Sequence, residues 1–182
     1  MNISDLMESS MKKEKPPALH IGSALIPIPK SLFDLWQQQK TVLLCLLLFG
    51  LVVWVFAPSL GCKFLFYDEN DEILCEPHVN SGLSLSNMVW AFTTLSHTNW
   101  NPLKWLSHML DCEFYGLNPW GHHLTSILIH ALNSVLVFVV LRMMTGAVWR
   151  SLVVAMVFGL HPLRVESVTW ICERKDVLSL FF

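Results

Sequence analysis

Four carboxylates lie within five residues of the chain, at Asp68, Glu69, Asp71 and Glu72. Adjacent like charges disfavour ionisation, so such a run can raise the pKa of one member and make it a general base. The same oxygens could instead ligate a cation. A solvated acidic turn is the ordinary alternative, and the composition of the segment does not separate these interpretations.

Three basic residues near the C-terminal end are candidates for binding an anion: Arg164, Arg174 and Lys175. Guanidinium and ammonium groups form charge-assisted hydrogen bonds with phosphate oxygens. The alternative is that they pair with the acidic residues of the same segment, which are Glu166, Glu173 and Asp176. Both interpretations stay open at the level of sequence.

Eight histidines raise the question of a metal or haem centre. His123 and His130 are seven residues apart in one apolar segment and His161 ends the next, but no histidine pair on one expected helix matches a pair on another. Cys112 with His122 and His123 lacks the spacing of a metal site. The sequence therefore predicts no metal ligands and no haem, while a divalent cation stays open as a cofactor.

The composition indicates a membrane protein. Only 14% of the 182 residues are charged and 53% are apolar, against roughly 25% charged in an ordinary globular domain. A net charge of −2 argues against binding nucleic acid, which needs clustered Lys and Arg. The segment 41–58 contains no charge and nearly crosses a hydrocarbon core of about 30 Å. We therefore predict an all-α integral membrane fold.

The apolar segments and the positions of the basic residues predict the topology. Lys30 and Lys40 precede the first apolar segment and place the N-terminus in the cytosol. The alternation then puts the three C-terminal cations on the outer face, where the positive-inside rule disfavours them, so they require an anionic partner. The expected regions are a cytosolic segment (1–40), a first transmembrane helix (41–58), an outer or lumenal loop (59–121), a second transmembrane helix (122–141), a short third one (147–163) and an outer segment with the start of a fourth (164–182).

The outer loop is expected to contain a helix at the membrane surface. Asn101 and Pro102 are a typical cap and first-turn pair and Gly116 is a typical stop, which predicts a helix from Pro102 to Tyr115. Its apolar residues recur on one face. His108 and Asp111 lie on other faces and are secondary candidates for a site.

Long ordered motifs between residues 60 and 182 resemble the N-terminal part of the transmembrane and tetratricopeptide-repeat (TPR) protein O-mannosyltransferases. They include Tyr67-Asp68-Glu69, the run from Asn99 to Asp111, the run from Gly116 to His123, His161-Pro162-Leu163-Arg164-Val165-Glu166 and Glu173-Arg174-Lys175-Asp176.

This resemblance implies a GT-C glycosyltransferase that takes a sugar, mannose being expected, from a polyprenyl- or dolichyl-phosphate donor and transfers it to a protein Ser or Thr hydroxyl. It implies catalysis by Asp68 and Glu69 and binding of the donor phosphate by Arg164, Arg174 and Lys175. His108, Asp111 and Glu166 are secondary. The resemblance implies either the bacterial plasma membrane or the endoplasmic reticulum.

The chain departs from the family pattern at two acidic positions and in its length. Glu69 replaces the second aspartate of the pair, and Glu76 replaces an asparagine before proline. The further membrane helices and the roughly 34-residue repeats of the family are not visible in the sequence. We therefore expect an N-terminal fragment that lacks part of the donor cavity, and the alternative function is a catalytically inactive fragment or a membrane interaction module.

Overall fold

The computed structural model describes residues 18–21, 24–27, 30–64, 70–95 and 100–181, with side chains described from Trp36 onward except at Asn70 and Asp71. The chain divides into two units, residues 1–44 and 45–182. In the first unit, strands β1 (Ala18–Ile21) and β2 (Ala24–Pro27) form an antiparallel pair with Ala18 opposite Pro27. The sequence analysis did not predict this hairpin.

Helix α2 (Lys30–Phe56) contains the first predicted span and begins well before it. It is followed by the short 3-10 helix η1 (Ala57–Gly61), which contains Pro58. Proline lacks an N–H and disfavours helical geometry in the residue before it, so the regular helix ends here. Around this end, Val52 and Phe56 are buried.

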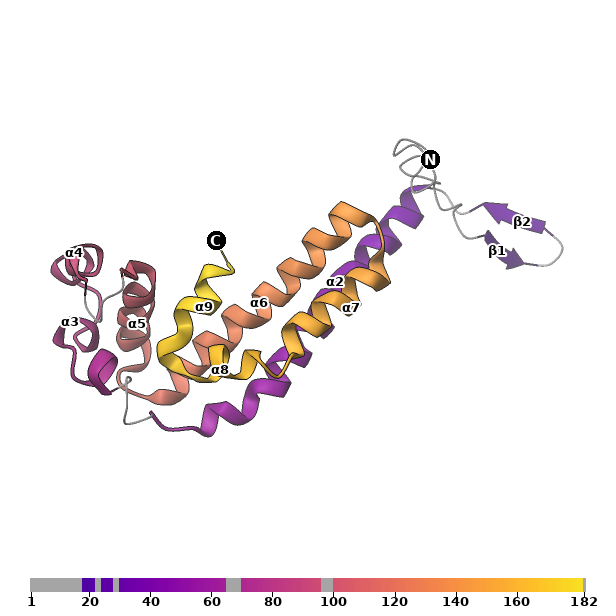
Figure 1. Cartoon of the computed structure of the whole chain (residues 1–182). Coiled ribbons are helices and arrows are strands. Elements are labelled where there is room, and N and C mark those ends of the chain that lie inside the picture. The colour runs from indigo at the N-terminus through magenta and orange to yellow at the C-terminus, as the bar shows by residue number, and fades with distance from the viewer. Residues whose placement is uncertain (1–17, 22–23, 28–29, 65–69, 96–99, 182) are drawn as a thin grey trace, which may run out of the picture. The chain divides into compact units, whose positions relative to one another are not determined.

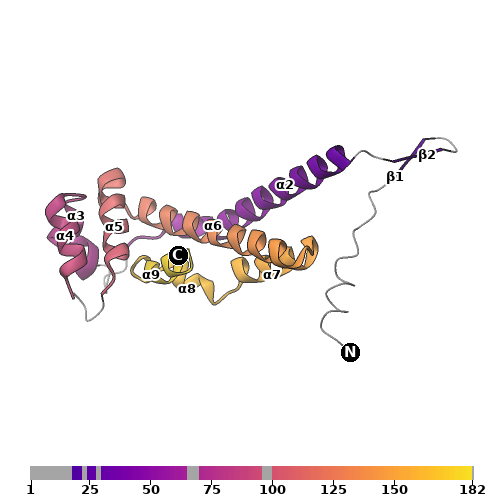
Figure 2. The ribbon, with the colours of Figure 1, turned by 90° about the horizontal axis from the view of Figure 1, so that it is seen from above.

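Helices α6 (Pro119–Thr145) and α7 (Val148–Leu160) pack side by side (Figures 1 and 2). The Asn118 side chain accepts a hydrogen bond from the Trp120 N–H and caps α6. Gly146, with φ of 67°, ends the helix in the left-handed conformation. At the far end of α7, a Cβ on Gly159 would collide with Ser134, so glycine permits the two helices to approach.

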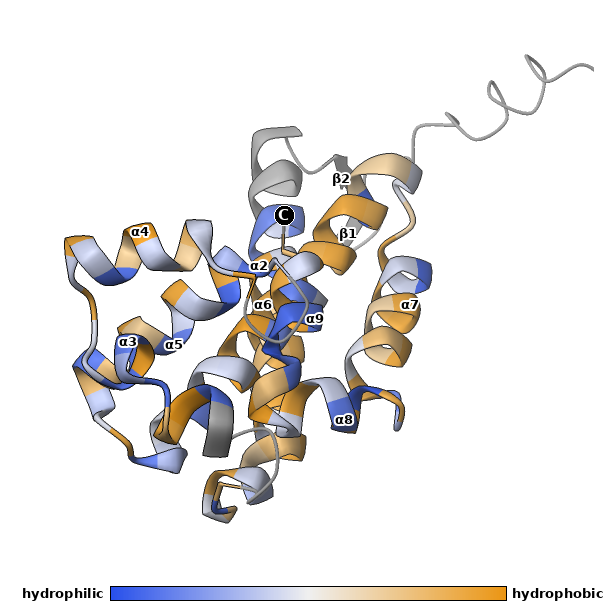
Figure 3. Ribbon diagram, turned by 60° about the vertical axis from the view of Figure 1, so that its left-hand side comes forward, coloured by the Kyte–Doolittle hydropathy of each residue, from blue (hydrophilic) through white to orange (hydrophobic). Residues whose placement is uncertain are grey.

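The apolar side chains of the long helices face outward. Two helices are long and apolar enough to cross a membrane, at Trp36–Gly61 and Pro119–Thr145, and only 17% and 39% of their most apolar windows are buried within the protein. A core helix of a soluble protein would bury most of that surface. Figure 3 shows much of α6 and α7 in apolar colours. The prediction of an all-α membrane fold is confirmed.

The described part of the segment 59–121, which was predicted to be an outer loop and is called the loop below, folds into short helices around a small core. The core consists of Ile73, Val79, Ala91, Trp105, Met109, Cys112 and Ile171. The helices that supply or cover it are η2 (Asn70–Leu74), α3 (Pro77–Asn80), α4 (Leu85–Thr93) and α5 (Pro102–Tyr115) from the loop, and α8 (Arg164–Thr169), η4 (Ile171–Glu173) and α9 (Arg174–Ser179) from the C-terminal segment. Ile171 therefore joins the C-terminal segment to the loop.

Helix α5 buries both polar and apolar side chains and exposes several apolar ones. Its bounds agree with the prediction and Gly116 has a φ of 60°, although the Asn101 side chain makes no capping hydrogen bond. His108 and Asp111 are buried. The exposed residues of α5 are Leu103, Leu110, Glu113, Phe114 and Tyr115, of which all but Glu113 are apolar or aromatic. This arrangement suits a helix whose outer stripe lies against lipid and whose polar side chains meet other parts of the protein.

The cysteines are expected to differ sharply in reactivity. Cys62 and Cys75 are exposed and free, whereas Cys112 and Cys172 are buried. Burial, together with the Asp111 charge, raises the pKa of Cys112 to about 11. Because the thiolate is the reactive form, a maleimide at pH 7 should label Cys62 and Cys75 and spare Cys112 until denaturant is added. Mass spectrometry of the labelled peptides measures this, and equal labelling of Cys112 and Cys62 in the folded protein would contradict the packing.

Candidate functional site

The predicted catalytic residues Asp68 and Glu69 lie outside the described residues. The chain on both sides of them is described and is attached to the outer-loop helices. Before them, the Phe64 ring lies edge-on to the His122 ring, with 5.5 Å between centroids. After them, Ile73 is fully buried in the core beside Trp105. Phe64 and Ile73, the described residues on either side, are therefore both packed against the rest of the protein.

Glu72, the last carboxylate of the acidic run, forms an ion pair with Lys104 of α5. Both side chains are buried. The Lys104 ammonium also lies 4.9 Å from the centroid of the Trp105 ring. Because a buried charge is costly unless it is paired, this contact fixes η2 against α5. The role of Glu72 in the acidic run is therefore structural, because it pairs with Lys104.

Lys175, a predicted phosphate ligand, lies near this pair. Its ammonium is 3.0 Å from Glu173, and it is close enough to Glu72 for the two charges to interact. Burial, which would lower the pKa of Lys175, is outweighed by the hydrogen bond to Glu173 and the nearby carboxylates, so the pKa is raised. The 37% exposed side chain therefore carries a positive charge that interacts with Glu173 and, more weakly, with Glu72.

Arg174 is fully buried and pairs with Asp111, with 2.5 Å between Nη1 and Oδ2. Its remaining partners are the His122 carbonyl at 2.7 Å, Ser126 Oγ at 3.1 Å and Ser107 Oγ at 3.4 Å. Burial lowers the pKa of Arg174 and the Asp111 carboxylate opposes the shift, but a guanidinium keeps its proton in proteins. The sequence offered Glu166, Glu173 and Asp176 as alternative partners of Arg174. In the structure Arg174 pairs instead with Asp111, which lies in the loop. In this arrangement the guanidinium joins α5, α6 and α9.

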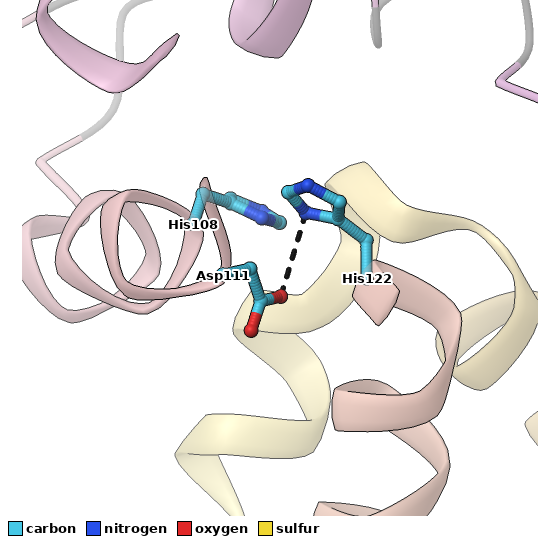
Figure 4. Close-up of side chains that lie close together, drawn as sticks. All are labelled: His108, Asp111 and His122. Carbon is cyan, nitrogen blue, oxygen red and sulfur yellow. Dashed lines mark ion pairs between the residues drawn. The ribbon is translucent and has the colours of Figure 1, made fainter. Parts of the chain in front are cut away.

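His108, Asp111 and His122 come together in a group that we call the histidine–aspartate cluster (Figure 4). One potential ligand atom from each lies within 4.8 Å of the other two. His122 Nδ1 is 3.4 Å from Asp111 Oδ2, and Asp111 Oδ1 accepts a hydrogen bond from Thr125 at 2.7 Å. Burial lowers the pKa of His108 well below its ordinary value, so its ring is neutral.

The sequence analysis identified two members of this cluster but did not include His122. It tested Cys112, His122 and His123 for metal-ligand spacing along the chain, which is a local criterion. The available signal was the three-residue spacing of His108 and Asp111 on one expected helix, followed by a short turn into the next helix. Helices joined by a short turn place their facing ends together.

The two remaining candidates lie in α8. The Arg164 guanidinium is 4.6 Å from the centroid of the Phe158 ring and is partly exposed. Glu166 is exposed in the first turn of the helix. Among residues 100–181, the contacts described for Arg164 place it with Phe158 rather than with Lys175. The structure therefore gathers Lys175, Arg174, Asp111 and His108 near the loop and leaves Arg164 and Glu166 at the surface of α8.

Curated relatives of the chain are named protein O-mannosyl-transferases. Tmtc2 of Drosophila melanogaster is 33% identical over 143 residues, which cover 74% of this chain and 15% of that protein. Drosophila Tmtc1 is 30% identical over 132 residues, 69% of this chain and 15% of the relative. Human TMTC2 is 36% identical over 88 residues, 48% of this chain and 10% of the relative.

The chain thus spans about 15% of the length of the Drosophila relatives that it matches. No protein-family model and no solved structure matches it. These relatives are named as enzymes. Their names do not favour the alternative function, a membrane interaction module.

Proposed function

The chain belongs to the TMTC-like family of protein O-mannosyl-transferases, and on that premise we propose that it is the N-terminal membrane part of a glycosyltransferase. The proposed reaction moves mannose from a polyprenyl- or dolichyl-phosphate donor to a Ser or Thr hydroxyl of a protein. The proposed setting is the endoplasmic reticulum, with the N-terminus in the cytosol, the outer loop in the lumen and the catalytic domain of GT-C type.

The observation that supports this proposal is the electrostatic interaction between Lys175 and Glu72. These residues are far apart in sequence, yet folding brings a protonated ammonium within electrostatic range of the last carboxylate of the acidic run. Glycosyl transfer from a lipid phosphate needs both kinds of group in one place. A base removes the proton from the acceptor hydroxyl as it attacks the anomeric carbon, and a cation stabilises the phosphate as it leaves.

The proposed roles of Asp68 and Glu69 follow from the family resemblance, and those of the cations also use their exposure in the structure. Asp68 and Glu69 act as the base and its acidic partner, and Lys175 binds the leaving phosphate. Arg164 is a second phosphate ligand, since its guanidinium is partly exposed. Arg174 is buried and paired with Asp111, so we assign it to holding the segment that presents Lys175.

A donor-dependent transfer assay tests the proposal. The full-length protein that contains this chain is placed in vesicles with mannosyl-phosphoryl-dolichol and an acceptor polypeptide, and labelled mannose on Ser or Thr is measured. Transfer that depends on the lipid donor supports the proposal. If nucleotide-linked mannose serves as the direct donor, or if the protein gives no transfer above protein-free vesicles, the proposal is wrong.

Lys175→Gln in the full-length protein is expected to raise the KM for the lipid donor about tenfold to a hundredfold, because a hydrogen bond to a charged group contributes about 1.5–3 kcal/mol. Lys175→Arg should retain most of the affinity. Lys63→Gln is the matched control, since Lys63 is an exposed lysine with no proposed role in donor binding. An unchanged donor KM in Lys175→Gln would remove Lys175 from the donor site.

A further inference from the structure

The histidine–aspartate cluster is built like a metal site. We propose that His108, Asp111 and His122 bind a divalent transition-metal ion of the zinc class. The cluster joins two residues of α5, one turn apart, to a residue in the first turn of α6. All three residues are at least 98% buried, so an ion held by them would be shielded from solvent.

The tautomer of His122 leaves a lone pair that faces the Asp111 carboxylate. His122 Nε2 is 3.2 Å from the Gly116 carbonyl, which only accepts hydrogen bonds, so Nε2 carries the proton. In the neutral ring Nδ1 is then an acceptor, and it lies 3.4 Å from Asp111 Oδ2. Arg174 already pairs with Oδ2, but Nδ1 has no hydrogen-bond partner among the described residues, so a metal ion between the two atoms would use the free lone pair of Nδ1.

The separation of these two atoms suits a tetrahedral ion. Zinc binds imidazole nitrogen at about 2.0–2.1 Å and carboxylate oxygen at about 2.0–2.2 Å. With tetrahedral angles, two such ligands are about 3.3–3.5 Å apart. The observed 3.4 Å falls within this range.

His108 supplies an independent observation. Neither ring nitrogen of His108 has a hydrogen-bond partner among the described residues, although the side chain is fully buried. A buried polar group without a partner is costly. Its ring lies beside that of His122, with 5.9 Å between the centroids, and Figure 4 shows the two rings pointing toward each other. A small rotation of the side chain would complete a third bond to the ion.

The outer contacts of the cluster are those that orient metal ligands. Metal-bound histidines commonly donate their second N–H to a backbone carbonyl, as His122 does to Gly116, and metal-bound carboxylates are themselves hydrogen-bonded. Asp111 Oδ1 accepts from Thr125 at 2.7 Å. These two contacts use His122 Nε2 and Asp111 Oδ1. They therefore orient Nδ1 and Oδ2 without occupying the lone pairs of those two atoms.

Arg174 sets the strength of binding. Its guanidinium lies 2.5 Å from Asp111 Oδ2, so it orients the carboxylate and also repels an incoming cation. We therefore expect weaker binding than at a comparable site that has no neighbouring guanidinium. Two imidazoles favour zinc or cobalt over magnesium, which prefers oxygen ligands. The proposed ion has three protein ligands and an open position for water.

The test is metal binding by the purified 182-residue chain in lipid nanodiscs, with Co²⁺ and Zn²⁺ as the probes. The wild-type chain should bind one Co²⁺, displaceable by Zn²⁺, with the visible absorption of a tetrahedral ion. His108→Phe should weaken binding at least tenfold. Because this change removes two unpartnered nitrogens, the metal-free variant should fold as well as wild type. The matched control is His161→Asn, which changes an exposed histidine outside the cluster and should bind as wild type does.

X-ray absorption of the Zn²⁺-loaded wild-type chain tests the ligands without any variant, and it should show scattering from two imidazoles. Absence of imidazole scattering, wild-type affinity in His108→Phe, or no binding by the wild-type chain would overturn the proposal. In the last case the contact between His122 and Asp111 would be made by a proton on His122, and nitrogen-15 shifts of that ring would identify the imidazolium.

Discussion

Replacing Arg174 by methionine is expected to destabilise the protein by about 3–5 kcal/mol, the usual effect of leaving one partner of a buried ion pair without the other. Arg174 is fully buried and Asp111 is 2% exposed, so water does not replace the lost guanidinium. The carbonyl of His122 and the hydroxyl of Ser126 lose a donor in the same step. Thermal unfolding in detergent, followed by circular dichroism, measures the change.

A double variant separates the ion pair from the volume of the side chain. Asp111→Leu with Arg174→Met removes both charges, and buried pairs replaced by apolar groups of similar size are often neutral or stabilising. The double variant should therefore be more stable than either single variant. Arg164→Met is the control, since Arg164 is partly exposed and its loss should cost little. Additive losses in the double variant would contradict a direct interaction.

Asp68→Asn in the full-length protein is expected to reduce mannose transfer by about 10²–10⁴-fold, the range that a positioned general base contributes. Asparagine keeps the size of the side chain and removes its basicity. The rate constant for transfer at saturating donor should fall, while expression and membrane insertion remain unchanged.

Glu113→Gln is the matched control for this change, because Glu113 is an exposed carboxylate of the same loop with no proposed role in transfer. It should retain the wild-type rate. Transfer by Asp68→Asn at the wild-type rate would remove Asp68 from the catalytic machinery. Loss of donor affinity with an unchanged rate constant would instead assign Asp68 to binding.

Local signals predicted the helices well, because helix ends are determined by a few neighbouring residues. Pro102 and Gly116 gave both bounds of α5. The hairpin of β1 and β2 carried no comparable signal. For α5, the apolar stripe was visible in the sequence but its surroundings were not. A stripe that faces lipid and one that faces a protein core have the same periodicity.

The partners of the charged residues could be predicted only where they are local. Lys175 pairs with Glu173, one of the acids of its own segment that the sequence analysis considered. Arg174 pairs with Asp111, which depends on the packing of α9 against α5 and cannot be read from either segment alone. The same holds for His122, since the cluster forms only when the turn after α5 brings the two helices together.

The Arg174 ion pair also has a consequence for the order in which the protein is made. Arg174 bonds to Ser107, 67 residues earlier in the chain, so α5 leaves the ribosome long before the guanidinium that neutralises its aspartate exists. At about 5–20 residues per second, the delay is roughly 3–13 s. During that time Asp111 remains an unpaired acid that favours water over the bilayer surface, and stable docking of α5 onto α6 is a late step of synthesis.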